Sequence, residues 1–420
     1  MRVGLINIGD EILAGKILNT NARELARWLG DLSHEVAFML TVADGVEPLA
    51  AALRQTLDET SPALPRCGML ILSGGLGPTH DDLTRDALAA YLGAPLERSE
   101  EAAAWLAEFL RVPAGDIGAG QALQLLVPRG AAALRNTTGT ACGIRFERNE
   151  CAVFAFPGVP REFRALFDAH CRPLLENRDG TLLRRRAVTF GLPESRQRDA
   201  LRGFTVPEPF RFSSLPNATG VTLALETFAP TADVPRLTAA LDAAWNDLLS
   251  RLPTDSIVDR EGNPLPQTVF RLLQDRHATV SCAESCTAGF VGYLLTELPG
   301  SSVVFEKGFL TYSNEAKREL LGVDDAVLRA HGAVSQETAL AMARGCRAKA
   351  GSDYAVAVTG IAGPDGGTPE KPVGLVYVAA VSAHGEVCAR HQFREDRDGN
   401  RRLSAYAALN QLRLLILKEL

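Results

Sequence analysis

The sequence predicts an α/β protein with several domains. Strand-like and helix-like stretches alternate along most of the chain, a pattern typical of sheets whose strands are joined by helices. A length of 420 residues corresponds to two or three domains. Polar stretches at 176–180 and 254–266 are typical of domain boundaries. We therefore expect domains at 1–175, 180–254 and 265–420.

The first domain is expected to contain a mostly parallel sheet. Apolar runs at 3–8, 36–42 and 69–72 predict strands. Helix-like stretches alternate with them, at 19–29, 48–57 and 83–92. Right-handed connections between parallel strands place helices on both faces of such a sheet. Ligands of these sheets bind at the carboxyl ends of the strands.

Three loops at those carboxyl ends carry candidate ligand-binding residues. Glycines let the backbone approach a phosphate, and N–H groups at a helix start can hold it. The candidate nucleotide-binding residues are Gly9, Asp10, Glu11, Asp44, Gly74, Gly75, Gly77 and Thr79. Asp81, Asp82 and Asp86 are typical ligands of a divalent cation such as Mg²⁺. Asp81 and Asp82 could instead cap the following helix, and both interpretations stay open.

The middle segment predicts a small α+β module. A strand at 184–190 is followed by a short helix, two strands and a long amphipathic helix, at 195–201, 210–213, 221–227 and 234–252. We interpret the three arginines at 184–186 as a solvated strand face rather than an RNA site. The formal net charge of −6 also makes nucleic acid an unlikely partner.

The last domain contains a candidate nucleophile, Ser285. It lies in a turn at 283–289, between a strand-like run and a helix-like run. Backbone N–H groups at a helix N-terminus could stabilise an oxyanion there, although a serine at such a turn is most often a helix cap. Because no His lies near, a Tyr or Lys with a lowered pKa would have to serve as the base. A final helix is expected at 402–419.

The remaining composition excludes some classes of protein. No uncharged run reaches the roughly 18 residues that span a bilayer, and the N-terminus shows no signal peptide, so we expect a cytoplasmic protein. Eight cysteines form no Cys-x-x-Cys pair and are expected to be buried or incidental thiols. Cys286 is the exception to test, because it neighbours the candidate nucleophile.

Four motifs of the last domain resemble one known family. They are Ala283-Glu284-Ser285-Cys286-Thr287 and the stretches 308–317, 331–335 and 359–367. Together they resemble the nicotinamide-nucleotide amidohydrolase domain of the CinA family, the competence and damage-inducible proteins. Ala288 departs from the pattern, because the family usually has a second Gly there.

The N-terminal loops resemble the molybdopterin-binding-like domain of the same family. The resemblance rests on Gly9-Asp10-Glu11, on 73–86 and on 156–162. The stretch 139–143 lacks the usual Pro before its last Gly, which affects that loop's geometry. In the family the middle position holds a module resembling KH domains, but this chain has no Gly-x-x-Gly loop to bind nucleic acid.

The resemblance implies deamidation of nicotinamide mononucleotide by Ser285, Tyr312 and Lys317, with no cofactor. Tyr312 and Lys317 are five residues apart, which favours a strand-to-helix turn between them. The substrate-binding residues that it implies are Glu284, Thr287, Asn314, Thr359, Gly360, Gly363, Gly366, Arg397 and Arg401. Glu395 and Asn400 depart from the family pattern around the two arginines.

For the N-terminal domain the resemblance implies hydrolysis of ADP-ribose with a divalent metal, and for the whole protein a homodimer. Two alternatives stay open. The protein could act mainly as an ADP-ribose pyrophosphatase, or it could be a non-catalytic binding protein associated with competence or recombination.

Overall fold

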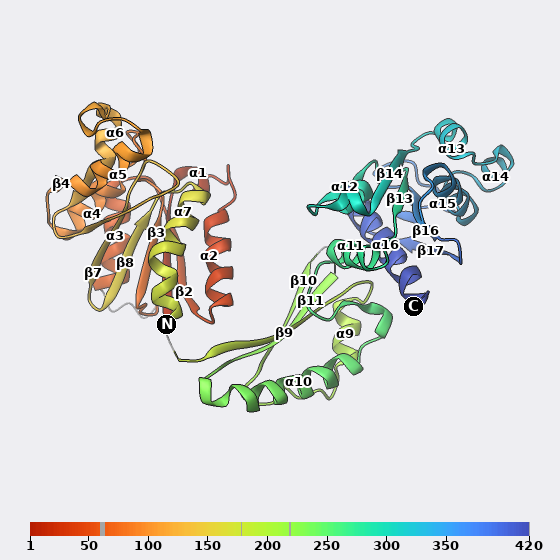
Figure 1. Ribbon diagram of the computed structural model, residues 1–420, viewed down its shortest axis with the longest axis horizontal. Coiled ribbons are helices and arrows are strands. Elements are labelled where there is room, and N and C mark those ends of the chain that lie inside the picture. The colour runs from red at the N-terminus through yellow and green to blue at the C-terminus, as the bar shows by residue number, and fades with distance from the viewer. Residues whose placement is uncertain (59–63, 178, 218–219, 420) are drawn as a thin grey trace. The chain divides into compact units, whose positions relative to one another are not determined.

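The computed structural model describes residues 1–58, 64–177, 179–217 and 220–419. The chain divides into two compact units, Met1–Leu182 and Leu183–Leu420 (Figure 1). The expected middle module and last domain therefore share one compact unit. None of the helices in the described ranges is long and apolar enough to cross a bilayer.

The N-terminal unit is built on a six-stranded sheet with the order β2-β1-β3-β8-β7-β6. Its four parallel strands are β1 (Arg2–Ile8), β2 (Glu35–Val42), β3 (Met69–Ser73) and β8 (Cys151–Phe156). Two further strands complete the sheet: β7 (Gly143–Arg148) pairs antiparallel with β8, and β6 (Ala132–Leu134) pairs antiparallel with β7. A separate antiparallel pair is formed by β4 (Leu96–Arg98) and β5 (Leu126–Pro128). The predicted, mostly parallel sheet is confirmed.

Helices cover both faces of this sheet, because alternate strand residues point to opposite sides. Leu70 and Leu72 of β3 join a core with α3 (Val46–Leu53), α4 (Thr84–Leu92) and α5 (Glu100–Leu110). Met69 and Ile71 join a second core with α2 (Thr20–Asp31) and α7 (Pro160–Leu166) (Figure 1). The short helices are α1 (Asp10–Leu13), α6 (Ala119–Ala122) and α8 (Arg172–Glu176).

The middle module has a four-stranded sheet with the order β10-β11-β9-β12. The elements are β9 (Thr181–Thr189), α9 (Glu194–Ala200), β10 (Arg211–Asn217), β11 (Gly220–Ala229), α10 (Val234–Ser250) and β12 (Ile257–Asp259). β12 lies in the polar stretch 254–266 that was expected at a domain boundary, and it pairs with β9. Arg184 and Arg185 form ion pairs with Glu226 and Asp242, so two of the three clustered arginines are paired inside the module.

The last domain has a five-stranded sheet with the order β14-β13-β15-β16-β17. β13 (Val280–Glu284) is parallel to its neighbours β14 (Phe305–Leu310) and β15 (Tyr354–Gly360). β16 (Leu375–Val381) is antiparallel to both of its neighbours, β15 and β17 (Glu386–Gln392). The helices are α11 (Leu265–Asp275), α12 (Phe290–Thr296), α13 (Asn314–Leu321), α14 (Asp325–His331), α15 (Gln336–Ala350) and α16 (Arg397–Lys418). One face packs on α11, α12 and α16, and the other on α13, α14 and α15.

The final helix begins at Arg397, five residues before the predicted start, because the Asp396 side chain accepts a hydrogen bond from the N–H of Gly399 at 2.8 Å. Within α16, Arg413 is 1% exposed and donates to the backbone oxygens of Asp255 and Ile257. Burial lowers the pKa of Arg413 to about 10. This side chain ties the last helix to the start of β12.

Candidate active site

Ser285 and Lys317 meet at the carboxyl ends of β13 and β14. Lys317 Nζ lies 3.2 Å from Ser285 Oγ. Ser285 follows β13 directly, and Lys317 is the fourth residue of α13, which Ser313 caps by accepting from the N–H of Ala316. The expected strand-to-helix turn between Tyr312 and Lys317 is confirmed, since β14 ends at Leu310 and α13 begins at Asn314.

The Lys317 amine is buried and surrounded by uncharged hydrogen-bond acceptors. The residue is 1% exposed, and its Nζ also donates to the backbone oxygens of Thr311 at 2.8 Å and Tyr312 at 3.4 Å. No carboxylate of the described residues forms an ion pair with it. Burial lowers its pKa from 10.5 to about 8 because the charged form loses hydration. Because a pKa near 8 leaves part of the amine neutral at neutral pH, Lys317 is suitable as a general base.

The loop after Ser285 is tightly turned. The Ser285 N–H donates to the oxygen of Val358 at 3.0 Å, which anchors the start of the loop. Ala288 has φ 50° and Gly289 has φ 96°, so both adopt the left-handed conformation. Within the described structure, the N–H groups of Cys286, Thr287 and Ala288 have no hydrogen-bond acceptor. Three unpaired donors therefore lie next to Ser285.

The structure corrects the expectation that N–H groups of the following helix stabilise the oxyanion. The carboxylate of Glu284 accepts hydrogen bonds from the N–H groups of Gly289, Val291 and Gly292, at 2.9, 3.0 and 2.9 Å. These donors at the start of α12 are therefore occupied. Glu284 itself, expected to bind substrate, is 1% exposed, and its carboxylate is directed into the protein.

Two arginines of α16 reach the region around Ser285. Arg397 donates to the oxygen of Gly363 at 2.5 Å and to the Tyr312 hydroxyl at 3.4 Å. Arg401 donates to the oxygen of Thr287 at 3.0 Å. Tyr312 is 65% exposed, and its hydroxyl forms no hydrogen bond with Ser285 or Lys317 in the described structure. The structure therefore places Tyr312 and Arg397 together at the surface, beside the Ser285–Lys317 pair.

The other expected substrate-binding residues are used in different ways. The buried Thr359 hydroxyl donates to the oxygen of Ala333 at 2.7 Å, whereas the hydroxyl of buried Thr287 has no partner. A Cβ atom on Gly360 would lie 2.7 Å from Val376 Cγ2, so this glycine permits close packing. Exposed Asn314 begins α13, and two glycines turn the chain with positive φ, Gly363 and Gly366.

Cys286 is a buried thiol with 6% exposure. Burial raises its pKa to about 12, which keeps the sulfur protonated at neutral pH. The thiolate needed for nucleophilic attack is therefore scarce. All eight cysteines are free, and six of them are buried, as the sequence predicted.

Thr311 is a residue of the site that sequence reasoning missed. It is fully buried, its carbonyl holds Lys317 Nζ, and its N–H donates to the oxygen of Glu284 at 2.7 Å. It lies in the motif 308–317, but a backbone role leaves no signal in residue type.

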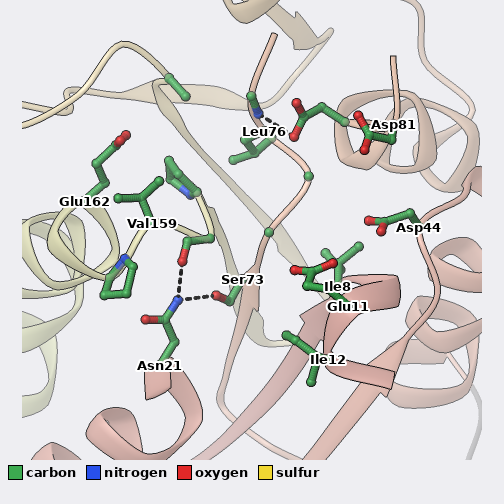
Figure 2. A pocket seen from close by; sticks show the side chains of 18 of the residues that line it. Ile8, Glu11, Ile12, Asn21, Asp44, Ser73, Leu76, Asp81, Val159 and Glu162 are labelled. Atoms are coloured by element: carbon green, nitrogen blue, oxygen red, sulfur yellow. Dashed lines mark hydrogen bonds between the residues drawn. The ribbon is translucent and has the colours of Figure 1, made fainter. Parts of the chain in front are cut away.

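A separate candidate site, a cavity of about 430 Å³, lies at the carboxyl ends of β1, β3 and β8. Seven of the expected residues line it: Glu11, Asp44, Gly74, Gly75, Gly77, Asp81 and Asp82. Four expected residues are not among the lining residues: Gly9, Asp10, Thr79 and Asp86. Asp86 is exposed on α4, pointing away because α4 turns its other face to the core. Sequence reasoning missed Asn21, which donates to Ser73 Oγ and to the oxygen of Gly158 (Figure 2).

Asp82 organises the glycine loop of this cavity. Its carboxylate accepts from the N–H groups of Gly77 and Thr79, both at 2.8 Å, and from the Thr79 hydroxyl at 2.5 Å. A Cβ atom on Gly77 would lie 2.4 Å from the Asp82 carboxylate, so only glycine fits there. Asp82 therefore supports the glycine loop, and the expected helix cap is not formed, because α4 has Leu83 at its N-cap and no side-chain cap hydrogen bond.

The rest of the cavity is strongly acidic. Glu11, Asp44 and Asp81 gather on one side and Glu162 lies on the other (Figure 2). Burial, together with repulsion from Glu11, Asp10 and Asp81, raises the pKa of Asp44. No Lys or Arg is found among the described residues that line the cavity. Nor do any three described His, Cys, Asp or Glu side chains form a group able to hold a metal ion.

Comparisons with known proteins match both the first and the last domain. Residues 262–416 match the CinA C-terminal domain, and residues 4–177 match a probable molybdopterin binding domain. A putative competence-damage inducible protein of Symbiobacterium thermophilum is 40% identical over 98% of both chains. A CinA-like protein of Geotalea daltonii is 36% identical, again over 98% of both chains.

Solved structures match parts of the chain. The competence/damage inducible protein CihA from Agrobacterium tumefaciens is 42% identical, covering 36% of this chain and 93% of its own, with a TM-score of 0.36. Because the family models together span most of the chain and full-length relatives exceed 30% identity, the chain belongs to the CinA family.

Proposed function

We propose that the last domain deamidates nicotinamide mononucleotide with Ser285 as the nucleophile and Lys317 as the base. The observation that carries the proposal is the 3.2 Å contact between Ser285 Oγ and the buried Lys317 Nζ, whose pKa is lowered to about 8. A neutral amine at this distance can accept the hydroxyl proton as the oxygen attacks. Membership of the CinA family supports the choice of substrate.

Each step has a group to perform it. Ser285 Oγ attacks the carboxamide carbon while its proton passes to Lys317 Nζ. The unpaired N–H groups of Cys286, Thr287 and Ala288 are available to the resulting oxyanion. Lys317 then returns the proton to the leaving nitrogen, and ammonia departs from an acyl-enzyme. Water attacks the ester with Lys317 again as base, which releases nicotinate mononucleotide and restores the serine.

Two surface residues can contact the pyridinium ring and the 5′-phosphate of the substrate. The exposed ring of Tyr312 can stack on the cationic pyridinium ring. Arg397 lies against the Tyr312 hydroxyl and the 363 loop, where its guanidinium can bind the 5′-phosphate.

The test measures ammonia and nicotinate mononucleotide after purified protein is incubated with nicotinamide mononucleotide. We expect product from the wild type and from Cys286→Ala, but not from Ser285→Ala. Cys286→Ala is the matched control, because it changes the adjacent buried residue. Absence of product from folded wild-type protein would refute the proposal.

For the N-terminal cavity we propose metal-dependent cleavage of a pyrophosphate bond in ADP-ribose or a related nucleotide. Its lining carries five carboxylates, Glu11, Asp44, Asp81, Asp82 and Glu162, and no basic side chain within the described ranges. A pyrophosphate would be repelled unless cations accompanied it. Mg²⁺ is commonly held by one or two carboxylates together with phosphate oxygens, and Asp44 and Asp81 fit that role. Such an ion neutralises phosphate charge and activates water.

Release of AMP and ribose 5-phosphate from ADP-ribose, dependent on added Mg²⁺ and abolished by a chelator, tests this second activity. If both domains are inactive while the folded protein still binds a competence or recombination protein, the non-catalytic alternative holds. We also propose a homodimer, to be measured by light scattering.

A further inference from the structure

We infer that Glu284 is a positioning residue that holds the nucleophile loop in its reactive shape. The inference rests on the proposed amidase and assigns Glu284 no contact with substrate. Its carboxylate joins the end of β13 to the start of α12, across the loop that carries Ser285 and the unpaired N–H groups of 286–288.

The contacts of Glu284 are those of a fully satisfied buried carboxylate. One oxygen accepts from the N–H groups of Gly289 and Val291, and the other accepts from the N–H of Gly292 and the Cys282 thiol at 3.5 Å. Hydrogen bonds from N–H groups to an ionised acceptor are stronger than those between neutral groups. A negative charge at a helix N-terminus is further stabilised by the helix dipole.

These contacts fix both ends of the nucleophile loop. On one side, the Glu284 carbonyl accepts from Thr311 and the Ser285 N–H donates to Val358. On the other side, the Glu284 side chain fixes three N–H groups of α12. The residues between these anchors cannot shift without breaking several hydrogen bonds at once. Ser285 Oγ is thereby kept near Lys317 Nζ and next to the free N–H donors.

The same hydrogen bonds explain why position 284 needs a carboxylate rather than an amide. Three backbone N–H groups approach two oxygens, whereas an amide offers one oxygen and an NH₂ group that would face an N–H donor. Glu284→Gln therefore keeps the size of the side chain but removes at least one acceptor for the three N–H groups.

The experiment compares Glu284→Gln with Asp324→Ala in the full chain. Asp324 caps α14 by accepting from the N–H of Ala326 at 2.8 Å, so its loss reports the effect of removing a helix cap outside the site. Two readouts are used: kcat and KM for nicotinamide mononucleotide, and phosphonylation of Ser285 by a fluorophosphonate. The final phosphonylation stoichiometry counts folded sites, and its rate reports the geometry of the nucleophile.

We expect Glu284→Gln to lower kcat per reactive site about 100-fold, because displacement by about 1 Å can cost that much. KM should stay within about threefold, since the carboxylate does not touch substrate. Phosphonylation should slow in parallel while its stoichiometry stays that of the wild type, and Asp324→Ala should behave as wild type. If Glu284→Gln does not fold, Glu284→Asp provides the same test, because it keeps the charge on a side chain one methylene shorter.

Three results would overturn the inference: an unchanged kcat and phosphonylation rate, a raised KM with unchanged kcat, or a loss explained wholly by fewer reactive sites. Failure of the amidase proposal is distinguishable from these. It would appear as wild-type protein that is phosphonylated at Ser285 yet produces no ammonia, and the phosphonylation rates would still decide the role of Glu284.

Discussion

The rate of the proposed deamidation should rise with pH through the titration of Lys317. The base must be neutral to accept the Ser285 proton, and burial lowers the Lys317 pKa to about 8, so protonation below that pH removes the base. The neutral fraction is then about one tenth at pH 7, about one hundredth at pH 6 and about nine tenths at pH 9. We expect kcat to follow these fractions and to level off above pH 9.

The assay separates nicotinamide mononucleotide from nicotinate mononucleotide by chromatography, at saturating substrate, from pH 6 to 9.5. Lys317→Met should lower kcat about 10²- to 10⁴-fold, the usual contribution of a general base, and should abolish the inflection. Lys371→Met is the matched control, because Lys371 Nζ donates to the oxygen of His331 at 2.7 Å, outside the Ser285–Lys317 pair. A wild-type kcat that is constant over this range, or an inflection that survives in Lys317→Met, would refute the reasoning.

Three further outcomes are expected. Cys286→Ala should keep kcat within about threefold of wild type, because the buried thiol stays protonated; a loss as large as that of Ser285→Ala would contradict this. Arg397→Ala should raise KM about tenfold or more by removing the proposed phosphate ligand, whereas Arg402→Ala, which loses an exposed ion pair with Asp398 and a cation–π contact with Phe290, should leave KM unchanged. Asp44→Asn and Asp81→Asn should each weaken Mg²⁺-dependent ADP-ribose cleavage, measured as AMP release across an Mg²⁺ titration; wild-type Mg²⁺ dependence in both variants would exclude these carboxylates as ligands.

Much of the fold could be predicted from the sequence because apolar periodicity reports burial. The runs at 3–8, 36–42 and 69–72 became parallel neighbours in one sheet. The contact between Ser285 and Lys317 could be anticipated only through the family motifs. It arises because β13 and β14 are adjacent parallel strands, whose carboxyl ends meet.

The partners of buried polar groups could not be predicted in this way. Glu284 has the residue type of a substrate ligand, but its carboxylate is consumed by three N–H groups of α12. Likewise Asp82 holds the loop around Gly77. The sequence shows that a carboxylate is present, but which N–H groups donate to it depends on where the next helix begins. β12 was missed because it is three residues long and lies in a polar stretch.

The anchoring of Arg413 limits how the protein can be dissected. Its guanidinium is buried and donates to the oxygens of Asp255 and Ile257, both upstream of the expected boundary at 265. A fragment beginning at that boundary would lack both acceptors, and each lost hydrogen bond to this charged group costs about 1.5 to 3 kcal/mol. A cut near residue 183 would spare these bonds, so the last domain should be excised together with the module that precedes it.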